Sequence, residues 1–323
     1  MKTLMSMRIF IAALILSVPI LADAAPDNIK IGVLAFGTVN WELEAIRNEG
    51  LDKKYGFELD VRLLANPDAG KIGLQANSMD IIATDWIWVS HQYQHGADFK
   101  FIPFSTQAGA IMAPATGAIR SLADLRGKRL GVAGGGLDKN WLLLKTYALR
   151  NIGLDMEHDT QAVFAAPPLL NQQLQNGKLD ALLTFWHFAA RQEAQGYRRI
   201  LDGRDVIRGL GIEVAVPNLG YVFKNSWAIQ HKKTLDAFIA ASNEARDLLC
   251  NSDQAWNKIA PLTQESDEST LKILRRDYCA GIVKQWGTPE KAAIAMIYRL
   301  VRETGGETLT GSAKDLPTEI FWR

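Results

Sequence analysis

The sequence predicts an α/β protein built from two similar lobes, because short apolar strands alternate with helices and the pattern repeats once along the chain. Residues 74–86 align with residues 174–186 at a constant offset of 100, with Leu, Gln, Asp, Thr and Trp in matching places. Upstream, residues 30–33 correspond to residues 129–132. A repeat of this length is far longer than a solenoid unit, so it indicates a duplicated lobe.

Each half of the repeat predicts a strand, a loop that contains glycine, and a helix. Residues 31–35 and 130–133 are short apolar runs, which are typical of buried parallel strands. Helices are predicted at residues 41–48, 141–149 and 167–177, where proline opens the third helix and glycine closes it. This alternation favours two mainly parallel sheets with flanking helices.

The last hundred residues have a different character. Beyond about Ser226 the sequence predicts helices alone, at residues 234–249, 266–276 and 289–302. We expect these C-terminal helices to pack on the first lobe, so that the first lobe is assembled from two separate segments of the chain.

The predicted lobes have definite boundaries. The first lobe comprises residues 25–110 and 224–323, and the second comprises residues 111–223. Strands near residues 108–113 and 213–223 would connect the lobes and serve as a two-strand hinge.

Composition excludes several classes of protein. The chain has 323 residues, of which 48% are hydrophobic and 22% charged, with a formal net charge of +1. This is the composition of a globular protein with a substantial core. Without an excess of basic residues, a nucleic-acid partner is not expected. Two cysteines are too few for a disulfide-built scaffold or a Cys-rich metal site.

The N-terminus predicts a secretory signal peptide over residues 1–24. Lys2 and Arg8 precede an uncharged run at residues 9–21, and an Ala-x-Ala site ends at Ala24. An uncleaved anchor is the alternative. A cleaved signal predicts export, most simply to a bacterial periplasm. In that oxidising compartment Cys250 and Cys279 could form a disulfide or remain two buried thiols, because spacing alone does not decide between them.

Ligands of open α/β sheets bind beyond the carboxyl ends of the strands, so the loops there form the candidate ligand site. Five of the nine tryptophans lie at these ends, which predicts a pocket that holds a flat or cationic ligand by stacking. For any single tryptophan, packing in the core is the commoner role. The candidate residues, including one from the second hinge strand, are Phe36, Gly37, Thr38, Asn40, Trp41, Thr84, Asp85, Trp86, Gly135, Asp138, Asn140, Phe185, Trp186, His187 and Glu213.

Catalytic, cofactor and metal motifs are weak. The glycines at residues 134–136 precede a helix but lack the Gly-Lys-Ser/Thr of a nucleotide loop. His91 and His95 are four residues apart, yet Gln92 stands where a zinc protease needs glutamate. The sequence has no G-x-S-x-G nucleophile motif. We therefore predict no enzyme activity, no cofactor and no metal site.

The segment 124–132 before the glycine-rich turn resembles the beginning of the second lobe in periplasmic solute-binding proteins. Pro167-Pro168, with Gly177 and Asp180 beyond it, is similar as well. The nearest class is the nitrate/sulfonate/taurine/thiamine-precursor type of ABC importers, and the resemblance covers residues 28–301.

This resemblance implies a two-lobed periplasmic binding protein fold of type II. It also implies a monomer that captures a small molecule between its lobes by hinge closure and delivers it to an ABC permease in the inner membrane. Two alternatives share the fold: an enzyme related to thiamine-pyrimidine synthesis, whose Cys-rich motif is missing here, and a periplasmic ligand sensor.

The sequence departs from sulfonate binders of this class at the ligand loops. Leu137 replaces their Ser or Thr, and Phe185-Trp186-His187 replaces an aromatic–acid–proline pattern. Both changes make the predicted cleft more apolar. We therefore predict an aromatic ligand that is neutral or cationic, with its amino groups bonded to Asp85 and Asp138. An aliphatic sulfonate or another small organic anion is the alternative ligand.

Overall fold

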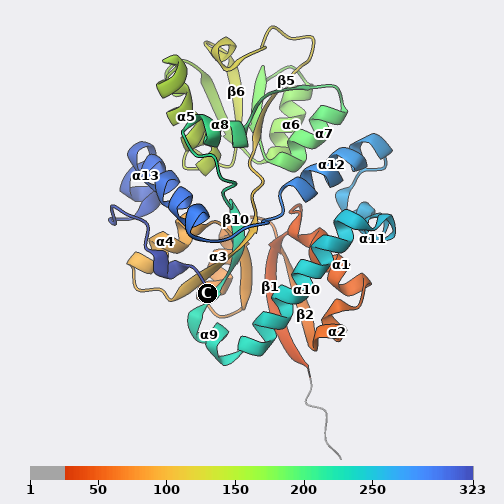
Figure 1. Cartoon of the computed structure of the whole chain (residues 1–323). Coiled ribbons are helices and arrows are strands. Elements are labelled where there is room, and N and C mark those ends of the chain that lie inside the picture. Colours follow the sequence, from red (N-terminus) through yellow and green to blue (C-terminus); the bar gives the residue numbers. More distant parts are fainter. Residues whose placement is uncertain (1–25, 323) are drawn as a thin grey trace, which may run out of the picture.

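The computed structural model describes residues 26–322, so the predicted signal peptide lies outside the described residues. The chain forms two lobes, each with a five-stranded sheet covered by helices on both faces (Figure 1). The predicted α/β class with two similar lobes is therefore confirmed.

The first lobe contains a sheet with the strand order β2-β1-β3-β10-β4. Strands β1, β2 and β3 are parallel, and β10 runs antiparallel to its neighbours β3 and β4. Its strands are β1 (Asp27–Leu34), β2 (Phe57–Leu64), β3 (Ile81–Thr84), β4 (Phe99–Ser105) and β10 (Leu219–Lys224). Its first helices are α1 (Val39–Asn48), α2 (Leu51–Tyr55), α3 (Pro67–Gln75) and α4 (Trp86–Gln94).

The second lobe repeats this arrangement with the order β7-β6-β8-β5-β9. Here β5 is the strand that runs antiparallel to its neighbours. The strands are β5 (Ala110–Ala113), β6 (Arg129–Ala133), β7 (Gln161–Ala165), β8 (Ala181–Thr184) and β9 (Arg198–Asp202). The helices are the short η1 (Leu122–Leu125), α5 (Lys139–Ile152), α6 (Pro167–Gln175), α7 (Trp186–Ala194) and α8 (Gly203–Gly209).

The residues that match in the sequence repeat build the same turn in both lobes. Asn77 and Gly177 follow α3 and α6 with φ values of 60° and 67°, a conformation that these two residue types tolerate best. Asp80 then accepts a hydrogen bond from the backbone N–H of Lys30 at 2.8 Å, and Asp180 accepts one from Arg129 at 2.8 Å. These aspartates therefore tie β3 and β8 to their neighbouring strands.

The C-terminal helices do not all pack on the first lobe. Helices α10 and α11 do so, against α1 and α2, but α12 packs mainly on α7 of the second lobe. Helix α13 contacts both α4 and α5, so it bridges the lobes. The elements are α9 (Asn225–Gln230), α10 (Lys232–Asn251), α11 (Asp253–Ile259), η2 (Ala260–Thr263), α12 (Glu268–Ala280), α13 (Thr288–Thr310) and η3 (Thr318–Ile320).

The chain crosses between the lobes twice, at residues 106–109 and between α8 and β10. The side-chain amide of Asn218 donates to the backbone oxygens of Thr106 at 3.2 Å and Gln107 at 3.0 Å, which binds the crossings together. Strand β10 pairs within the first sheet, so residues 219–223 lie in the first lobe. The predicted boundary at residue 223 had placed them in the second lobe. Gly109 is required at the first crossing, because a Cβ there would lie 2.4 Å from the backbone oxygen of Thr184.

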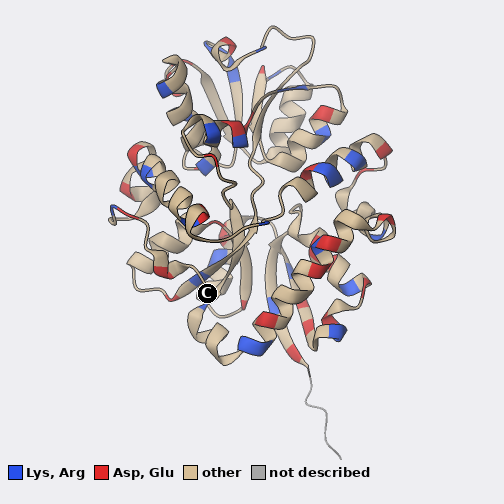
Figure 2. Cartoon of the chain, viewed as in Figure 1, with Lys and Arg blue, Asp and Glu red and all other residues tan. Residues whose placement is uncertain are grey.

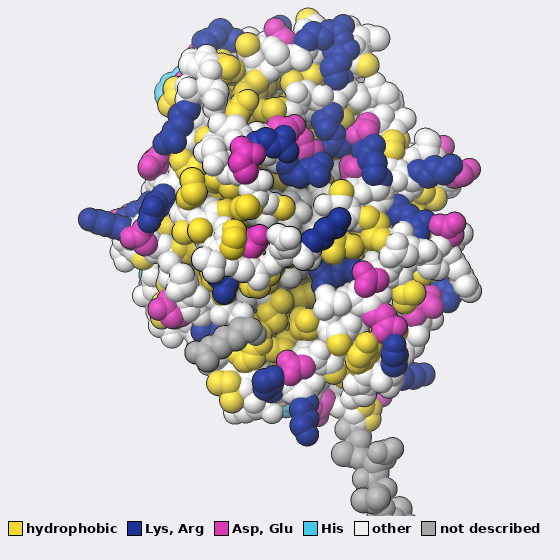
Figure 3. Space-filling model, viewed as in Figure 1, with side chains coloured by type: hydrophobic (Ala, Val, Ile, Leu, Met, Phe, Trp, Pro, Cys, Tyr) yellow, Lys and Arg dark blue, Asp and Glu magenta, His cyan; other side chains and the backbone are white. Residues whose placement is uncertain are grey.

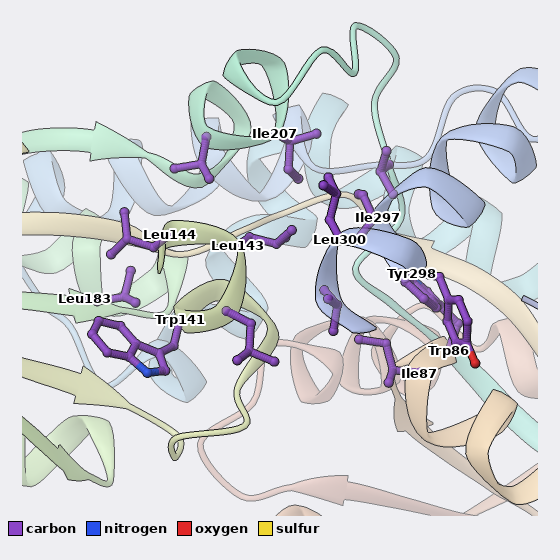
Figure 4. Packing of buried hydrophobic residues seen from close by; sticks show 14 of the residues in the cluster. Trp86, Ile87, Trp141, Leu143, Leu144, Leu183, Ile207, Ile297, Tyr298 and Leu300 are labelled. Atoms are coloured by element: carbon purple, nitrogen blue, oxygen red, sulfur yellow. The ribbon is translucent and has the colours of Figure 1, made fainter. Parts of the chain in front are cut away.

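The largest apolar core is continuous across the lobes. It joins residues of α4 and β4 in the first lobe to residues of β6 and α5 in the second, through α13. Figure 4 shows Leu143 of α5 directed toward Leu300 of α13, with Trp86 and Tyr298 beyond them. Positive and negative side chains are intermixed over the face drawn in Figure 3, in keeping with a net charge of +1.

A disulfide joins Cys250 of α10 to Cys279 of α12. Of the two states that the sequence left open for these cysteines, the structure has the bonded one. Helix α12 is therefore covalently attached to the first lobe, although most of its packing is on the second.

Replacing both cysteines by serine should lower the free energy of unfolding by about 3–4 kcal/mol, because the bond closes a loop across a sequence separation of 29 residues. Urea unfolding of the Cys250→Ser/Cys279→Ser variant beside the oxidised wild type measures this. Equal midpoints would show that the bond does not stabilise the fold.

Candidate functional site

A small cavity of about 10 Å³ lies between the lobes, beside the first crossing. Thr38 precedes α1 and Trp186 begins α7, so the loops after β1 and β8 both reach it, as expected for strand ends of α/β sheets. We call this cavity the interlobe site. It is lined by Thr38, Phe104, Ser105, Trp186, Arg246, Tyr278, Gly281 and Ile282.

Aromatic rings from both lobes meet at the interlobe site. The ring of Trp41 lies 5.9 Å from that of Trp186, centroid to centroid, in an edge-to-face arrangement. Trp41 also contacts Tyr278 at 6.0 Å and Trp256 at 5.8 Å. Such contacts stabilise the approach of the lobes beyond the burial of apolar area alone. Among these aromatic rings, Trp186 is the one from the second lobe, and it forms part of the cavity wall.

A buried ion pair stands next to the cavity. The Nε atom of Arg246 on α10 lies 3.7 Å from Oε2 of Glu42 on α1. Glu42 also accepts hydrogen bonds from the hydroxyl groups of Tyr221 at 2.6 Å and Ser242 at 2.5 Å. Burial raises the pKa of Glu42, against the opposing effects of Arg246 and the hydroxyls. Burial alone would lower the pKa of Arg246, but Glu42 raises it, so the guanidinium is charged.

Several buried polar atoms near the site have no hydrogen-bond partner among residues 26–322. They include Oε2 of Glu42, the hydroxyls of Tyr278 and Thr184, and both ring nitrogens of His187. Burial, together with the positive charge of Arg191, lowers the pKa of His187 to about 3, so its ring is neutral at pH 7. An unpaired buried polar group costs about 1–3 kcal/mol, and such groups commonly bind water or a ligand.

Some of the residues predicted for the site have structural roles. Asp85 caps α4 by accepting from the backbone N–H groups of Ile87 and Trp88. Asp138 caps α5 in the same way, through the backbone of Asn140. Trp86 is fully buried, with its indole N–H donating to the backbone oxygen of Pro217 at 3.0 Å.

The other predicted residues lie at varying distances from the cavity. Thr38 and Trp186 line it, and Trp41 contacts it through Trp186 and Tyr278. The side-chain amide of Asn40 donates to the backbone at the end of β1, and that of Asn140 accepts from Gly109. Glu213 is exposed. The remaining members of the predicted set are partly or fully buried near the strand ends but do not line the cavity: Phe36, Gly37, Thr84, Gly135, Phe185 and His187.

The sequence analysis missed Phe104, Arg246 and Tyr278, which line the cavity from β4, α10 and α12. Arg246 and Tyr278 lie in the C-terminal helices, which we had regarded only as packing elements. One available signal was an acidic residue, Glu42, on the apolar face of the first predicted helix, because a fully buried carboxylate requires a cationic or hydrogen-bonding partner.

Ion pairs join α12 and the turn before it to the second lobe. Arg191 of α7 pairs with Glu265 at 2.7 Å, and Arg199 of β9 lies 3.2 Å from Asp277. Arg276, which adjoins Asp277, pairs with the second-lobe residue Glu193 at 3.2 Å. In Figure 2, blue segments of α12 lie between the two lobes. We call these contacts the interlobe ion pairs.

Within residues 26–322, no three His, Cys, Asp or Glu side chains gather closely enough to hold a metal ion. None of the helices in that range combines the length and apolar character needed to span a membrane.

Comparison with known proteins places the chain in a family. The family model described as NMT1/THI5 like matches residues 56–255, more than half of the chain. The chain belongs to this NMT1/THI5-like family. A search of curated protein sequences finds no match.

Solved structures share the fold. The alkanesulfonate-binding protein SsuA from Xanthomonas axonopodis pv. citri, bound to MOPS, is 18% identical with a TM-score of 0.70, covering 93% of this chain and 99% of that chain. The aliphatic sulphonate binding protein SsuA from Escherichia coli is 19% identical with a TM-score of 0.69, covering 89% and 94%. The ligand binding component of an ABC-type import system from Staphylococcus aureus is 16% identical with a TM-score of 0.68, covering 89% and 94%. The predicted two-lobed binding-protein fold is therefore confirmed.

The interlobe ion pairs should favour the closed arrangement of the lobes. Replacing Glu265 by glutamine removes the carboxylate that pairs with Arg191, and we expect this to destabilise closure by roughly 1–2 kcal/mol, between the values for exposed and buried pairs. Small-angle scattering of the protein without ligand should then give a larger radius of gyration than for the wild type.

The control for this prediction is Glu268→Gln, three residues further along the chain at the start of α12. Glu268 pairs with Lys272 one turn away, and both side chains are largely exposed. The control should scatter like the wild type. If Glu265→Gln does so too, the interlobe ion pairs do not contribute to closure.

Proposed function

We propose that this protein is the periplasmic solute-binding component of an ABC importer. It captures a small aromatic solute, neutral or cationic, between its two lobes and presents the closed form to a membrane permease. The single observation that carries the proposal is the interlobe site, whose walls come from both lobes and include three aromatic rings. A ligand that contacts both lobes binds the closed form better than the open form, so it shifts the equilibrium toward closure.

The walls of the interlobe site support an aromatic ligand. Phe104 and Trp186 offer ring faces or edges to a flat molecule, and the unpartnered hydroxyl of Tyr278 offers a hydrogen bond. Asp85 and Asp138 are occupied by capping, so we now assign the polar contacts to Thr38, Ser105, Arg246 and Tyr278, in place of those two carboxylates.

The structural relatives support the transport role. Those reported above are binding proteins for sulfonates or the ligand-binding part of an import system. Closure in such a receptor requires no bond to be made or broken, so we propose that the bound solute is released unchanged. The predicted signal peptide supports a periplasmic location, and the disulfide is consistent with an oxidising compartment.

Native mass spectrometry of protein purified from its own periplasm tests the receptor role. We expect one small molecule to co-purify in a one-to-one complex, and to be recovered with an unchanged mass after it is displaced. Conversion of that molecule on incubation with the protein would contradict the proposal and favour an enzyme on the same fold.

Replacing Trp186 by alanine should weaken binding of the co-purified solute by about 1–3 kcal/mol, because the change removes the indole wall of the site. Isothermal titration of stripped protein measures the loss. The control is Trp227→Ala, since Trp227 lies on α9 of the first lobe and stacks on His231. Equal affinities for the two variants would show that Trp186 does not contact the ligand.

A further inference from the structure

The charge balance of the interlobe site is set by two residues. Of the described residues that line the cavity, Arg246 alone carries a formal charge. By itself, a guanidinium beside an aromatic wall would suit a sulfonate or a carboxylate, since its planar N–H groups match those anions. However, Glu42 lies 3.7 Å from Arg246, inside the protein, and is completely buried.

We propose that Glu42 determines the ligand charge that the interlobe site accepts: by neutralising Arg246, it makes the site exclude sulfonates and other small anions and admit neutral or cationic aromatic molecules. This inference rests on the proposed function, because it assigns the class of solute captured at the same site. Glu42 is a positioning and charge-balancing residue here, and does not itself line the cavity.

The surroundings of Glu42 hold its carboxylate in place. Tyr221 of β10 and Ser242 of α10 both donate to Oε1, so the side chain cannot turn away without losing two buried hydrogen bonds. Its Oε2 atom faces Arg246 and lacks a hydrogen-bond partner in the described chain. The carboxyl group next to the cavity is therefore held in position before any ligand enters.

The guanidinium of Arg246 is also partly occupied. Its Nη1 donates to the backbone oxygen of Phe104 at 3.0 Å, and its Nη2 donates to the side-chain oxygen of Asn243. An entering anion must therefore compete for donors that are already engaged, and it must approach Glu42 as a like charge. A neutral or cationic ligand meets no such repulsion, and its N–H groups find an acceptor in the hydroxyl oxygen of Tyr278, which lines the cavity.

The test uses three probes with the same ring and different charges: benzamide, benzamidine and benzenesulfonate. Binding to the stripped full-length mature protein is measured by isothermal titration at pH 7.5. We expect the wild type to bind benzamide or benzamidine more tightly than benzenesulfonate. In the Glu42→Gln variant Arg246 is no longer balanced, so the affinity for benzenesulfonate should rise at least tenfold and that for benzamidine should fall.

The matched control is Glu244→Gln, two residues before Arg246 on the same helix. Glu244 pairs with Lys54 on the surface of the first lobe, away from the cavity. This variant loses the same charge from the protein as a whole, and its preference among the three probes should equal that of the wild type. A gain in sulfonate affinity in both variants would show an effect of net charge and overturn the inference.

A pH series on the wild type gives a second test, which does not depend on the folding of a variant. Because burial raises the pKa of Glu42 above the ordinary glutamate value of 4.5, lowering the pH from 7.5 to 4.5 protonates most of it and leaves Arg246 unbalanced. The groups that face Glu42 do not titrate in this range, since Arg246 has a raised pKa and Tyr221 and Tyr278 have pKa values raised well above that of ordinary tyrosine. The affinity for benzenesulfonate should increase on acidification, and a flat profile would contradict the inference.

The failure of this inference can be distinguished from the failure of the proposed function. If the wild type prefers benzenesulfonate, or if Glu42→Gln binds it no better than the wild type does, Glu42 does not set the ligand charge. A co-purified solute released unchanged would still support the receptor. If the solute is converted instead, the proposed function fails, whatever the selectivity of the site.

Discussion

The two short chain crossings are the constraint on which the rest of the structure depends. Asn218 in the second crossing is bonded to the backbone of the first, and its own backbone N–H donates to Ser105 at 2.7 Å. The carboxyl ends of both sheets therefore face each other across one narrow region. The end of α12 closes this region, because Thr106 donates from its backbone to the oxygen of Gly281 at 2.8 Å. Ser105 and Gly281, which line the interlobe site, are therefore positioned by this junction.

The C-terminal helices give this junction two opposing attachments. The disulfide fixes α12 to α10, and Arg275 adds a hydrogen bond from its Nε to the backbone oxygen of Leu249 at 2.8 Å. On its other side, α12 meets the second lobe through the interlobe ion pairs. Opening of the lobes must break those ion pairs or strain the first-lobe attachment. A disulfide to the first lobe, together with ion pairs to the second lobe that can break and form again, is suited to reversible closure.

The repeat made much of the fold predictable from the sequence. The left-handed turns at Asn77 and Gly177 and the aspartates after them are local features, so their spacing shows directly in the chain. The strand-end rule predicts that Thr38 and Trp186 lie close together, and both line one cavity; their contact with a ligand stays a prediction. Local pattern did not decide whether Asp85 and Asp138 act as helix caps or as ligand contacts, since an aspartate before a helix can serve as either.

The rest of the site depends on contacts between distant parts of the chain. Arg246 reaches the cavity only because α10 packs on α1, where Glu42 requires a buried cation. Tyr278 reaches it because α12 lies between the lobes, whereas we expected α12 on the first lobe alone. Helical periodicity indicates that a face is buried, but not which of two lobes covers it. Helix α13 shows the same limit, since its apolar residues contact both lobes.

The most direct test of closure around a solute is the distance between the lobes in solution. Both native cysteines are bonded to each other, so cysteines introduced at Lys53 and Lys178, exposed residues of the first and second lobes, can be spin-labelled selectively. We expect the protein with its co-purified solute to give a single short distance, and the stripped protein to give a longer or broader distribution that returns to the short distance when the solute is restored. Identical distributions with and without the solute would contradict the account.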